Sequence, residues 1–263
     1  MKKIVIRILI VFVVLFGLGM LLVSMFLGTV IKKGVQTVGP MLTKVDIKLD
    51  SVSLSLLSGS GSVKGLVVGN PEGYKTPSAI KAGSASLALR PGSLFSDKIV
   101  IKSVNVQAPE ITFETNLKDN NLSKILANVE AAAGVTGDKP ATKPNEPAPA
   151  KEAKPSKKLQ VDDFLITGGK IHVSITTLGG QSMTVPLPEI HLTALGQGPD
   201  GITGAELTKR VLQAIEKAAV QASSGAVADL GNQAAKLGKD LGKSGTDAAG
   251  KITEGIGGLF KKK

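Results

Sequence analysis

The feature that most constrains the fold of this chain is an uncharged run of 24 residues near the N-terminus, from Ile8 to Ile31. As an α-helix this run would be about 36 Å long, which is enough to cross a hydrocarbon core of about 30 Å. The alternative is a cleaved signal peptide, whose apolar core is usually about 7–15 residues long and ends at a small-residue cleavage site. This run is longer and ends Met25-Phe26-Leu27-Gly28-Thr29, without an Ala-x-Ala pattern. The sequence therefore predicts a retained, single-pass transmembrane helix.

Basic residues flank both ends of this helix, so charge favours one orientation only by a small margin. Lys2, Lys3 and Arg7 precede the apolar run, and Lys32 and Lys33 follow it. A short N-terminus that stays in the cytoplasm is the simpler arrangement. We therefore expect the remaining mass of the chain to be exported.

The composition argues against several classes of function. Seven phenylalanines, one tyrosine and no tryptophan leave few of the large side chains that fill a dense enzyme core. The absence of cysteine excludes disulfides, thiolate metal sites and a cysteine nucleophile. The net charge of +11 is spread along the chain without stacking aromatic residues, so it favours attraction to anionic lipid over binding to nucleic acid.

After the anchor, the spacing of apolar residues changes from a helical period to a period of two. Val45, Ile47 and Leu49 alternate with charged residues, and the apolar phase slips by one at Asp50-Ser51, which predicts a bulge or bend in a strand. A short helix is expected over 121–133, from the apolar stripe within it. Alternation and turn residues predict further strands over 62–68, 84–89, 99–106, 110–115, 159–166, 170–177, 181–187 and 189–195.

These elements predict five segments. Residues 1–43 form the transmembrane anchor and a stalk helix that is broken near Gly39-Pro40, and residues 44–135 form a first β stretch with the short helix. Residues 136–158, rich in proline and lysine, are expected to be a disordered linker and a domain boundary. Residues 159–202 form a second β stretch. Residues 203–263 form a glycine-rich amphipathic helical tail that begins with the capping-box pattern Thr203-Gly-Ala-Glu206.

No pattern in the sequence predicts catalysis. His172 and His191 occupy the polar phase of alternating strands, and no third metal ligand follows at a useful spacing. Asp162 and Asp163 are consecutive strand residues, so their side chains point to opposite faces. The chain also lacks a Gly-x-Ser-x-Gly, a Walker loop and a His-Glu-x-x-His motif. We therefore expect no enzyme activity, no catalytic residue, no metal and no cofactor.

The order of these features resembles a known family. The anchor leads into Val52-Ser-Leu-Ser-Leu-Leu-Ser-Gly-Ser-Gly-Ser-Val-Lys-Gly-Leu-Val-Val-Gly-Asn-Pro-Glu-Gly-Tyr74. Ser84-Ala-Ser-Leu-Ala-Leu-Arg-Pro-Gly-Ser-Leu and Lys98-Ile-Val-Ile-Lys-Ser-Val-Asn-Val-Gln-Ala-Pro-Glu-Ile-Thr-Phe113 follow, and Leu159–Leu195 repeats a strand, Gly-Gly, strand pattern. Over about 150 residues, the chain resembles the N-terminal module of AsmA-like bacterial envelope proteins.

The residue patterns predict an α+β fold with one N-terminal transmembrane helix, strands in two stretches and a long C-terminal amphipathic helix, although this glycine-rich helix is not part of the family's pattern. The resemblance implies that the strands form a curved antiparallel β-sheet with an apolar concave face. It also implies a bacterial inner-membrane location with the bulk of the chain in the periplasm, where relatives are implicated in phospholipid movement or outer-membrane assembly. Roughly nine strands would give a groove that extends about 43 Å across the strands, which is too short to bridge an envelope alone. We therefore expect an accessory in envelope lipid homeostasis or outer-membrane assembly and no conduit. The expected partners are the inner membrane, phospholipid acyl chains and other envelope proteins, with no nucleic acid. The alternation predicts six lipid-facing residues: Val45, Ile47, Leu49, Ile171, Val173 and Ile175.

A second interpretation stays open. The Gly-Asn-Pro turn after a β run and the Ala/Gly/Lys-rich tail also resemble stress-protective proteins of the late-embryogenesis type. Under this interpretation the chain is an anchored structural or protective envelope protein without lipid handling. The anchor favours the first interpretation, because such protective proteins are usually soluble.

Overall fold

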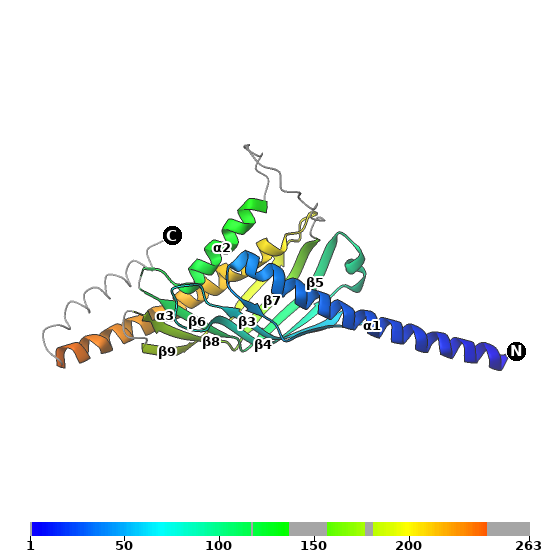
Figure 1. Ribbon diagram of the computed structural model, residues 1–263, viewed down its shortest axis with the longest axis horizontal. Helices are drawn as coiled ribbons and strands as arrows, with labels where there is room; N and C mark the ends of the chain where they lie inside the picture. Colours follow the sequence, from blue (N-terminus) through cyan, green and yellow to red (C-terminus); the bar gives the residue numbers. More distant parts are fainter. Residues whose placement is uncertain (1, 117, 137–156, 177–180, 241–263) are drawn as a thin grey trace, which may run out of the picture.

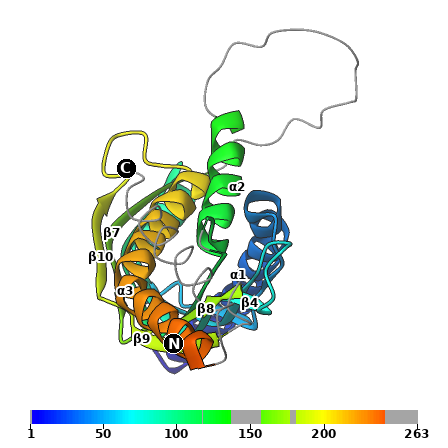
Figure 2. The ribbon, with the colours of Figure 1, turned by 90° about the vertical axis from the view of Figure 1, so that its left-hand side faces the viewer.

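The computed structural model describes residues 2–116, 118–136, 157–176 and 181–240. A long N-terminal helix α1 (Lys2–Thr43) runs into a curled ten-stranded sheet, and two further helices, α2 (Asn121–Thr136) and α3 (Gly204–Asp240), complete the fold (Figure 1). All three helices lie on the inner side of the curled sheet (Figure 2). The predicted α+β class is therefore confirmed. Residues 241–263 of the predicted tail lie outside the described residues.

The strands follow the alternation that the sequence predicts. They are β1 (Ile47–Lys48), β2 (Ser51–Leu54), β3 (Ser60–Gly69), β4 (Ser78–Leu89), β5 (Lys98–Gln107), β6 (Glu110–Thr115), β7 (Lys158–Thr167), β8 (Lys170–Ile175), β9 (Gln181–Pro186) and β10 (Ile190–Leu195), with a short 3-10 helix η1 (Pro91–Phe95) between β4 and β5. The bend predicted at Asp50-Ser51 separates β1 from β2.

The predicted break in α1 near Gly39-Pro40 is wrong, because the helix continues through Pro40 to Thr43. A proline there removes one backbone hydrogen bond within a turn of the helix end. Tertiary contacts hold that last turn: Thr43 is buried, its hydroxyl donates to the Gly39 carbonyl at 2.9 Å, and its own carbonyl accepts from the Asn128 side chain at 2.9 Å.

The sheet is mixed, which corrects the expected antiparallel sheet. β5 pairs with β7 in parallel and β6 pairs with β8 in parallel, whereas the other pairs are antiparallel. Across both parallel pairs each residue faces the one numbered 60 higher, from Lys98 opposite Lys158 to Thr115 opposite Ile175. The chain therefore repeats one bent strand unit and lays the copies side by side.

Short strands that follow each other in sequence also lie end to end, so the sheet is narrower than nine strands would make it. The sheet has six rows of strands. β3 and β4 each form a row alone, and the other four rows are two strands laid end to end: β1 with β2, β5 with β6, β7 with β8, and β9 with β10. Five spacings of about 4.8 Å give a width of about 24 Å. The expected width of about 43 Å is wrong for this reason.

A crease crosses all rows at one level. Gly65 in β3 and Gly83 in β4 fall at matching register, Ala108 separates β5 from β6, and Gly168 separates β7 from β8. Gly65, Ala108 and Gly168 have positive φ angles of 64°, 47° and 66°, a region that favours residues without a large side chain. The crease divides the sheet into a proximal half (β2, β5, β7, β10 and the adjoining parts of β3 and β4) and a distal half (β1, β6, β8, β9 and the rest of β3 and β4).

The two predicted β stretches belong to one sheet. A parallel neighbour requires a crossover connection, usually through a helix. Here α2 and the segment that follows it make the crossover from β6 to β7. The segment 136–158, predicted as a domain boundary, thus connects two neighbouring rows, although residues 137–156 lie outside the described part of the chain.

The sealed core lies in the distal half. Phe113 and Val173 on the sheet, together with Ile125 and Val129 of α2, are at most 2% exposed. Leu212, Ile215 and Ala219 of α3 pack into the same cluster. α2 and α3 therefore cover most of the inner face of the distal half.

One buried carboxylate fastens the distal end. Glu114 is fully buried in β6. Its carboxylate oxygens accept hydrogen bonds from the backbone amides of Lys75 and Thr76, at 2.7 and 2.9 Å. They also accept from the Thr76 hydroxyl at 2.6 Å and from the Asn70 side-chain amide at 3.2 Å. Burial raises the pKa of the neighbouring Tyr74, and the negative charges of Asp119 and Glu114 add to that rise. The network holds the β3–β4 loop against β6, because a buried carboxylate is stable only when its oxygens are paired.

We expect Gly65→Ala to destabilise the fold by about 1–3 kcal/mol, because alanine is strained at this positive φ and its Cβ would lie 1.9 Å from an Asp50 carboxylate oxygen. Thermal unfolding of the detergent-solubilised protein by circular dichroism measures the effect. Gly83→Ala is the matched control at the same level of the sheet, since a Cβ there meets nothing within 4 Å. Equal melting temperatures for the two variants would contradict the assigned role of the crease.

Replacing Glu114 with alanine removes the carboxylate that accepts four hydrogen bonds from the β3–β4 loop. We expect a loss of about 2–4 kcal/mol, seen as a fall of roughly 5–15 °C in Tm. Glu110→Ala, at an exposed position of the same strand, should change stability by no more than about 0.5 kcal/mol. A melting temperature for Glu114→Ala as high as that of the control would show that the network contributes nothing.

Candidate apolar binding groove

The candidate binding site is an apolar groove at the crease, between the sheet and the first half of α3. Its volume is about 300 Å³, at the lower end of the range for ligand pockets. None of its lining residues is titratable. They are Val63, Leu66, Val68, Ile80, Ala82 and Ala85 of β3 and β4, Val106, Pro109, Ile111, Phe164 and Ile166 of β5 to β7, and Leu207, Thr208, Val211, Leu212 and Ile215 of α3.

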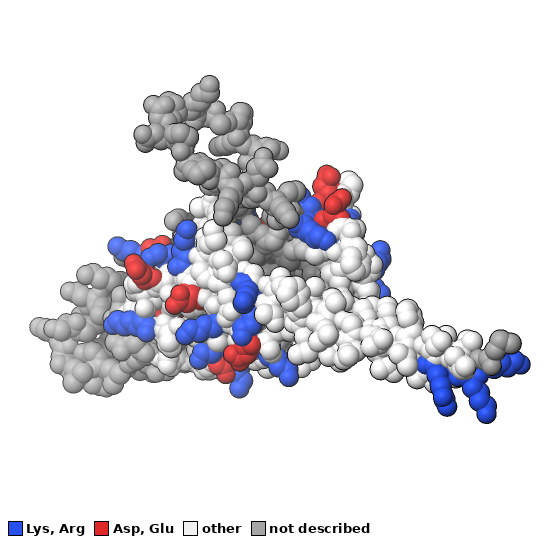
Figure 3. Space-filling model, turned by 45° about the vertical axis from the view of Figure 1, so that its right-hand side comes forward, with Lys and Arg blue, Asp and Glu red and all other residues white. Residues whose placement is uncertain are grey.

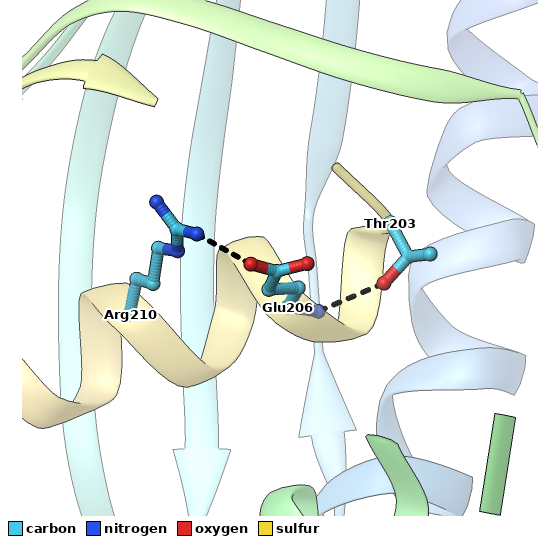
Figure 4. A network of polar contacts seen from close by, with 3 residues as sticks. All are labelled: Thr203, Glu206 and Arg210. Atoms are coloured by element: carbon cyan, nitrogen blue, oxygen red, sulfur yellow. Dashed lines mark hydrogen bonds and ion pairs between the residues drawn. The ribbon is translucent and has the colours of Figure 1, made fainter. Parts of the chain in front are cut away.

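Local capping chemistry sets the start of α3 above the groove. The Thr203 hydroxyl accepts from the Glu206 amide at 3.1 Å, and the Glu206 carboxylate pairs along the helix with Arg210 (Figure 4). The predicted helix start at Thr203 is confirmed. The i,i+4 ion pair of Glu206 lies on the face of α3 that is turned away from the sheet. Leu207 and Val211, on the opposite face, point to the sheet and line the groove.

An apolar stripe of α1 flanks the open side. Ile31, Val35 and Val38 are exposed by 38%, 36% and 51%, and their spacing puts them on one helix face with Leu42. Leu42 packs against the distal core, so this face of α1 is directed to the inner side of the sheet. The outer surface of the sheet and its helices carries many charged side chains, whereas α1 carries none from Ile8 to Ile31, up to its basic N-terminal end (Figure 3).

The inner face of the proximal half remains partly open. Leu87, Val104 and Phe164 lie side by side in register across β4, β5 and β7, and all three are only half-buried. A smaller cluster around Val161, Leu195 and Ile202 closes one margin of this half. The groove is therefore continuous with an apolar surface that no helix seals.

The predicted lipid-facing residues lie elsewhere. Ile171, Val173 and Ile175 are fully buried in the distal core, Val45 and Leu49 are 6% and 3% exposed, and Ile47 is half-buried. None of the six lines the groove. Alternation identified the inner face of the sheet, but it carries no information about which part of that face a helix covers. Ser174, in the polar phase of the same strand as Val173, is only 9% exposed, and it lies opposite the buried Glu114 of β6.

The polar candidates are separate surface features. His172 bonds the Thr184 hydroxyl at 2.9 Å, and His191 pairs with Asp163 at 2.5 Å, both at exposed sites. Within the described ranges no group of three or more histidine, aspartate or glutamate residues could hold a metal ion. The two histidines do not form a common site, since each binds a different partner.

Comparison with protein families, curated proteins and solved structures finds no match to this chain. The geometry of the groove and of the helix that leads into it therefore carries the functional argument.

Proposed function

We propose that this chain is a short AsmA-like protein of the bacterial envelope, anchored in the inner membrane by α1, that binds phospholipid acyl chains in the periplasm through the groove. The observation that carries the proposal is the contrast between the buried inner face of the distal half and the partly open proximal half, where the groove has an uncharged lining. Leaving apolar side chains wet costs about 1.5–3 kcal/mol each relative to full burial. Exposed apolar surface of this kind marks an interaction site, and a lining without polar partners suits a hydrocarbon chain.

The position of the groove beside the anchor supports the same assignment. α1 is long and apolar enough to span a membrane, with a mean hydropathy of 2.9 in its most apolar window and none of that window buried. The same helix continues without a break into the module, where Gly28 and Thr43 are buried. A signal peptide would leave after export, whereas this helix forms part of the fold. A role in lipid homeostasis or outer-membrane assembly follows for a module that is held at the membrane with an open apolar groove.

The lining also supports a binding function over an enzymatic one. Catalysis requires positioned acids, bases or nucleophiles near the bound substrate. The groove supplies aliphatic side chains, one phenylalanine and one threonine. We therefore assign it no reaction.

A photo-crosslinking residue tests the proposal directly. Phe164 lines the groove, and benzoyl-phenylalanine at this position keeps an aromatic side chain there. We expect ultraviolet irradiation of intact cells to attach phospholipid to position 164, detected by mass spectrometry of the purified protein.

Leu165 provides the matched control, since it is the next residue of β7 and points to the opposite face. Phospholipid at 164 and not at 165 supports the proposal. Crosslinks from 164 only to the protein's own α3 would show a closed sheet, and the anchored structural interpretation would then replace lipid binding.

Filling the groove should reduce the amount of lipid that the protein retains. Ala85 is half-buried and lines the groove, so Ala85→Phe places a ring in the space for an acyl chain. We expect native mass spectrometry of the detergent-extracted variant to show a severalfold lower lipid-bound fraction. Ser86→Phe adds the same ring at the exposed neighbouring position and should retain lipid like the wild type; equal retention by both variants would argue against the groove as the site.

A further inference from the structure

The anchor helix runs along the edge of the sheet in a fixed register. Gly39 of α1 lies against Ile47, and the Gln36 and Lys32 side chains donate to the carbonyls of Leu49 and Asp50 at 3.4 and 2.7 Å. Further toward the N-terminus, the Gly28 backbone lies so close to β2 that a Cβ there would be 2.2 Å from the Val52 carbonyl oxygen. The helix and the edge strands thus run antiparallel, and the proximal half of the sheet lies beside residues of the apolar run.

The same antiparallel alignment of α1 continues as far as the end of the sheet that the β2–β3 hairpin forms. Gly17, Met20, Leu21 and Ser24 of α1 face residues 53–57 and 60–62 of the β2–β3 hairpin across a gap of about 580 Å³. The part of the helix that faces no strand is therefore Ile4–Phe16, about 20 Å long at 1.5 Å per residue. Arg7 is the one charged residue in this part, and its long side chain reaches the head groups from its place near the helix end. A hydrocarbon core is about 30 Å thick. A helix that crosses it must place about 10 Å of the crossing beside the hairpin.

The loops at this end of the sheet carry exposed apolar side chains, as a position inside the membrane requires. Among the residues whose exposure the structure describes, only two large hydrophobic side chains outside α1 are exposed: Leu57 at 71% and Phe95 at 88%. Leu57 lies in the β2–β3 hairpin and Phe95 ends η1. The two loops are neighbours, because the Leu89 amide before η1 donates to the Gly59 carbonyl in the hairpin at 2.8 Å.

We propose that the β2–β3 hairpin and η1 form a membrane-inserted tip, which buries Leu57 and Phe95 in the leaflet of the anchoring bilayer that faces the module. Continuity with the anchor identifies the bilayer as the partner, since the helix fixes the tip at this depth. The depth agrees with the 5–10 Å at which interfacial apolar segments usually lie. Arg90 and Lys157 flank η1, and Lys157 donates to the Leu94 carbonyl. These cations suit anionic head groups, although Asp97 beside them offsets part of the charge.

Insertion places the open end of the proximal half against lipid. The inner face of β4 and β5 begins at this tip and leads through Leu87 and Val104 to the groove at the crease. An acyl chain could then enter along the sheet without crossing water. This consequence rests on the proposed function, whereas the insertion of the tip stands on the geometry of the anchor alone.

Site-directed fluorescence in the full-length protein tests the insertion, and the absence of cysteine allows single labels. Ser58→Cys and Gly92→Cys place a label in each loop at exposed positions and keep Leu57 and Phe95. The probe is the labelled protein in nanodiscs of phosphatidylcholine and phosphatidylglycerol that contain a lipid with a nitroxide near the head group. Phe16→Cys on the bare helix is the positive control, and Ser182→Cys, exposed in β9 of the distal half, is the negative control.

We expect both loop labels to be quenched roughly threefold or more above Ser182→Cys, because nitroxide quenching needs contact within the interfacial layer. Melting temperatures equal to the wild type confirm that each labelled variant is folded. Quenching at either loop position no greater than at Ser182→Cys would overturn the proposal. Such a failure would not bear on the proposed lipid binding in the groove, since lipid crosslinks at position 164 report that binding independently.

Discussion

Left-handed backbone conformations at matching positions bend β3, the β5–β6 row and the β7–β8 row at the same level, and the rest of the molecule depends on this crease. Gly65 allows the bend in β3, where the Asp50 side chain approaches too closely for any Cβ. Gly168 and Ala108 bend the two copies of the repeated strand unit at the same point of their 60-residue register. A flat sheet of this composition would expose one whole apolar face. The bent sheet instead encloses the helices that cover the distal half, and it leaves the proximal half for another partner.

The division into halves separates the stable core from the site of the proposed lipid binding. In the distal half, α2 and α3 bury the inner face, and the Glu114 network holds the loop that crosses its end. In the proximal half, Leu207 and Val211 reach the margin of the sheet, while Leu87 and Val104 stay half-buried. Residues that must exchange an acyl chain for water or for another chain cannot be sealed by a helix of the same protein. A closed core beside an open groove satisfies both demands within one sheet.

Much of the fold could be predicted from the sequence, because the strands and helix starts depend on local patterns. The alternation over 110–115 matches β6 at both ends, and the Thr203 cap sets the start of α3. The site was missed because it depends on contacts between distant segments. Val173 and Phe164 both lie on the inner face of the sheet, and only the path of α3 buries the first and leaves the second at the groove. Glu114 looked like an ordinary polar strand residue, since the loop that buries it is about 40 residues away in sequence. The parallel pairing was likewise unpredictable, because it depends on a crossover and not on the strands themselves.

The anchor helix explains why the groove would have a fixed relation to the membrane. The covered stripe of α1 recurs every fourth residue, at Met20, Ser24, Gly28, Lys32 and Gln36. The residues between them are exposed, apart from the half-buried Leu27. Small side chains in this stripe let the helix approach the edge of the sheet, and Gly28 permits direct backbone contact with β2. A flexible stalk would let the module turn freely above the bilayer, and the groove would then meet lipid only by chance. A helix packed on the sheet from Met20 to Thr43 transmits the direction of the membrane span to the module. Under the proposed function, the same contact that stabilises the edge of the sheet would direct the open end of the groove to the lipid surface.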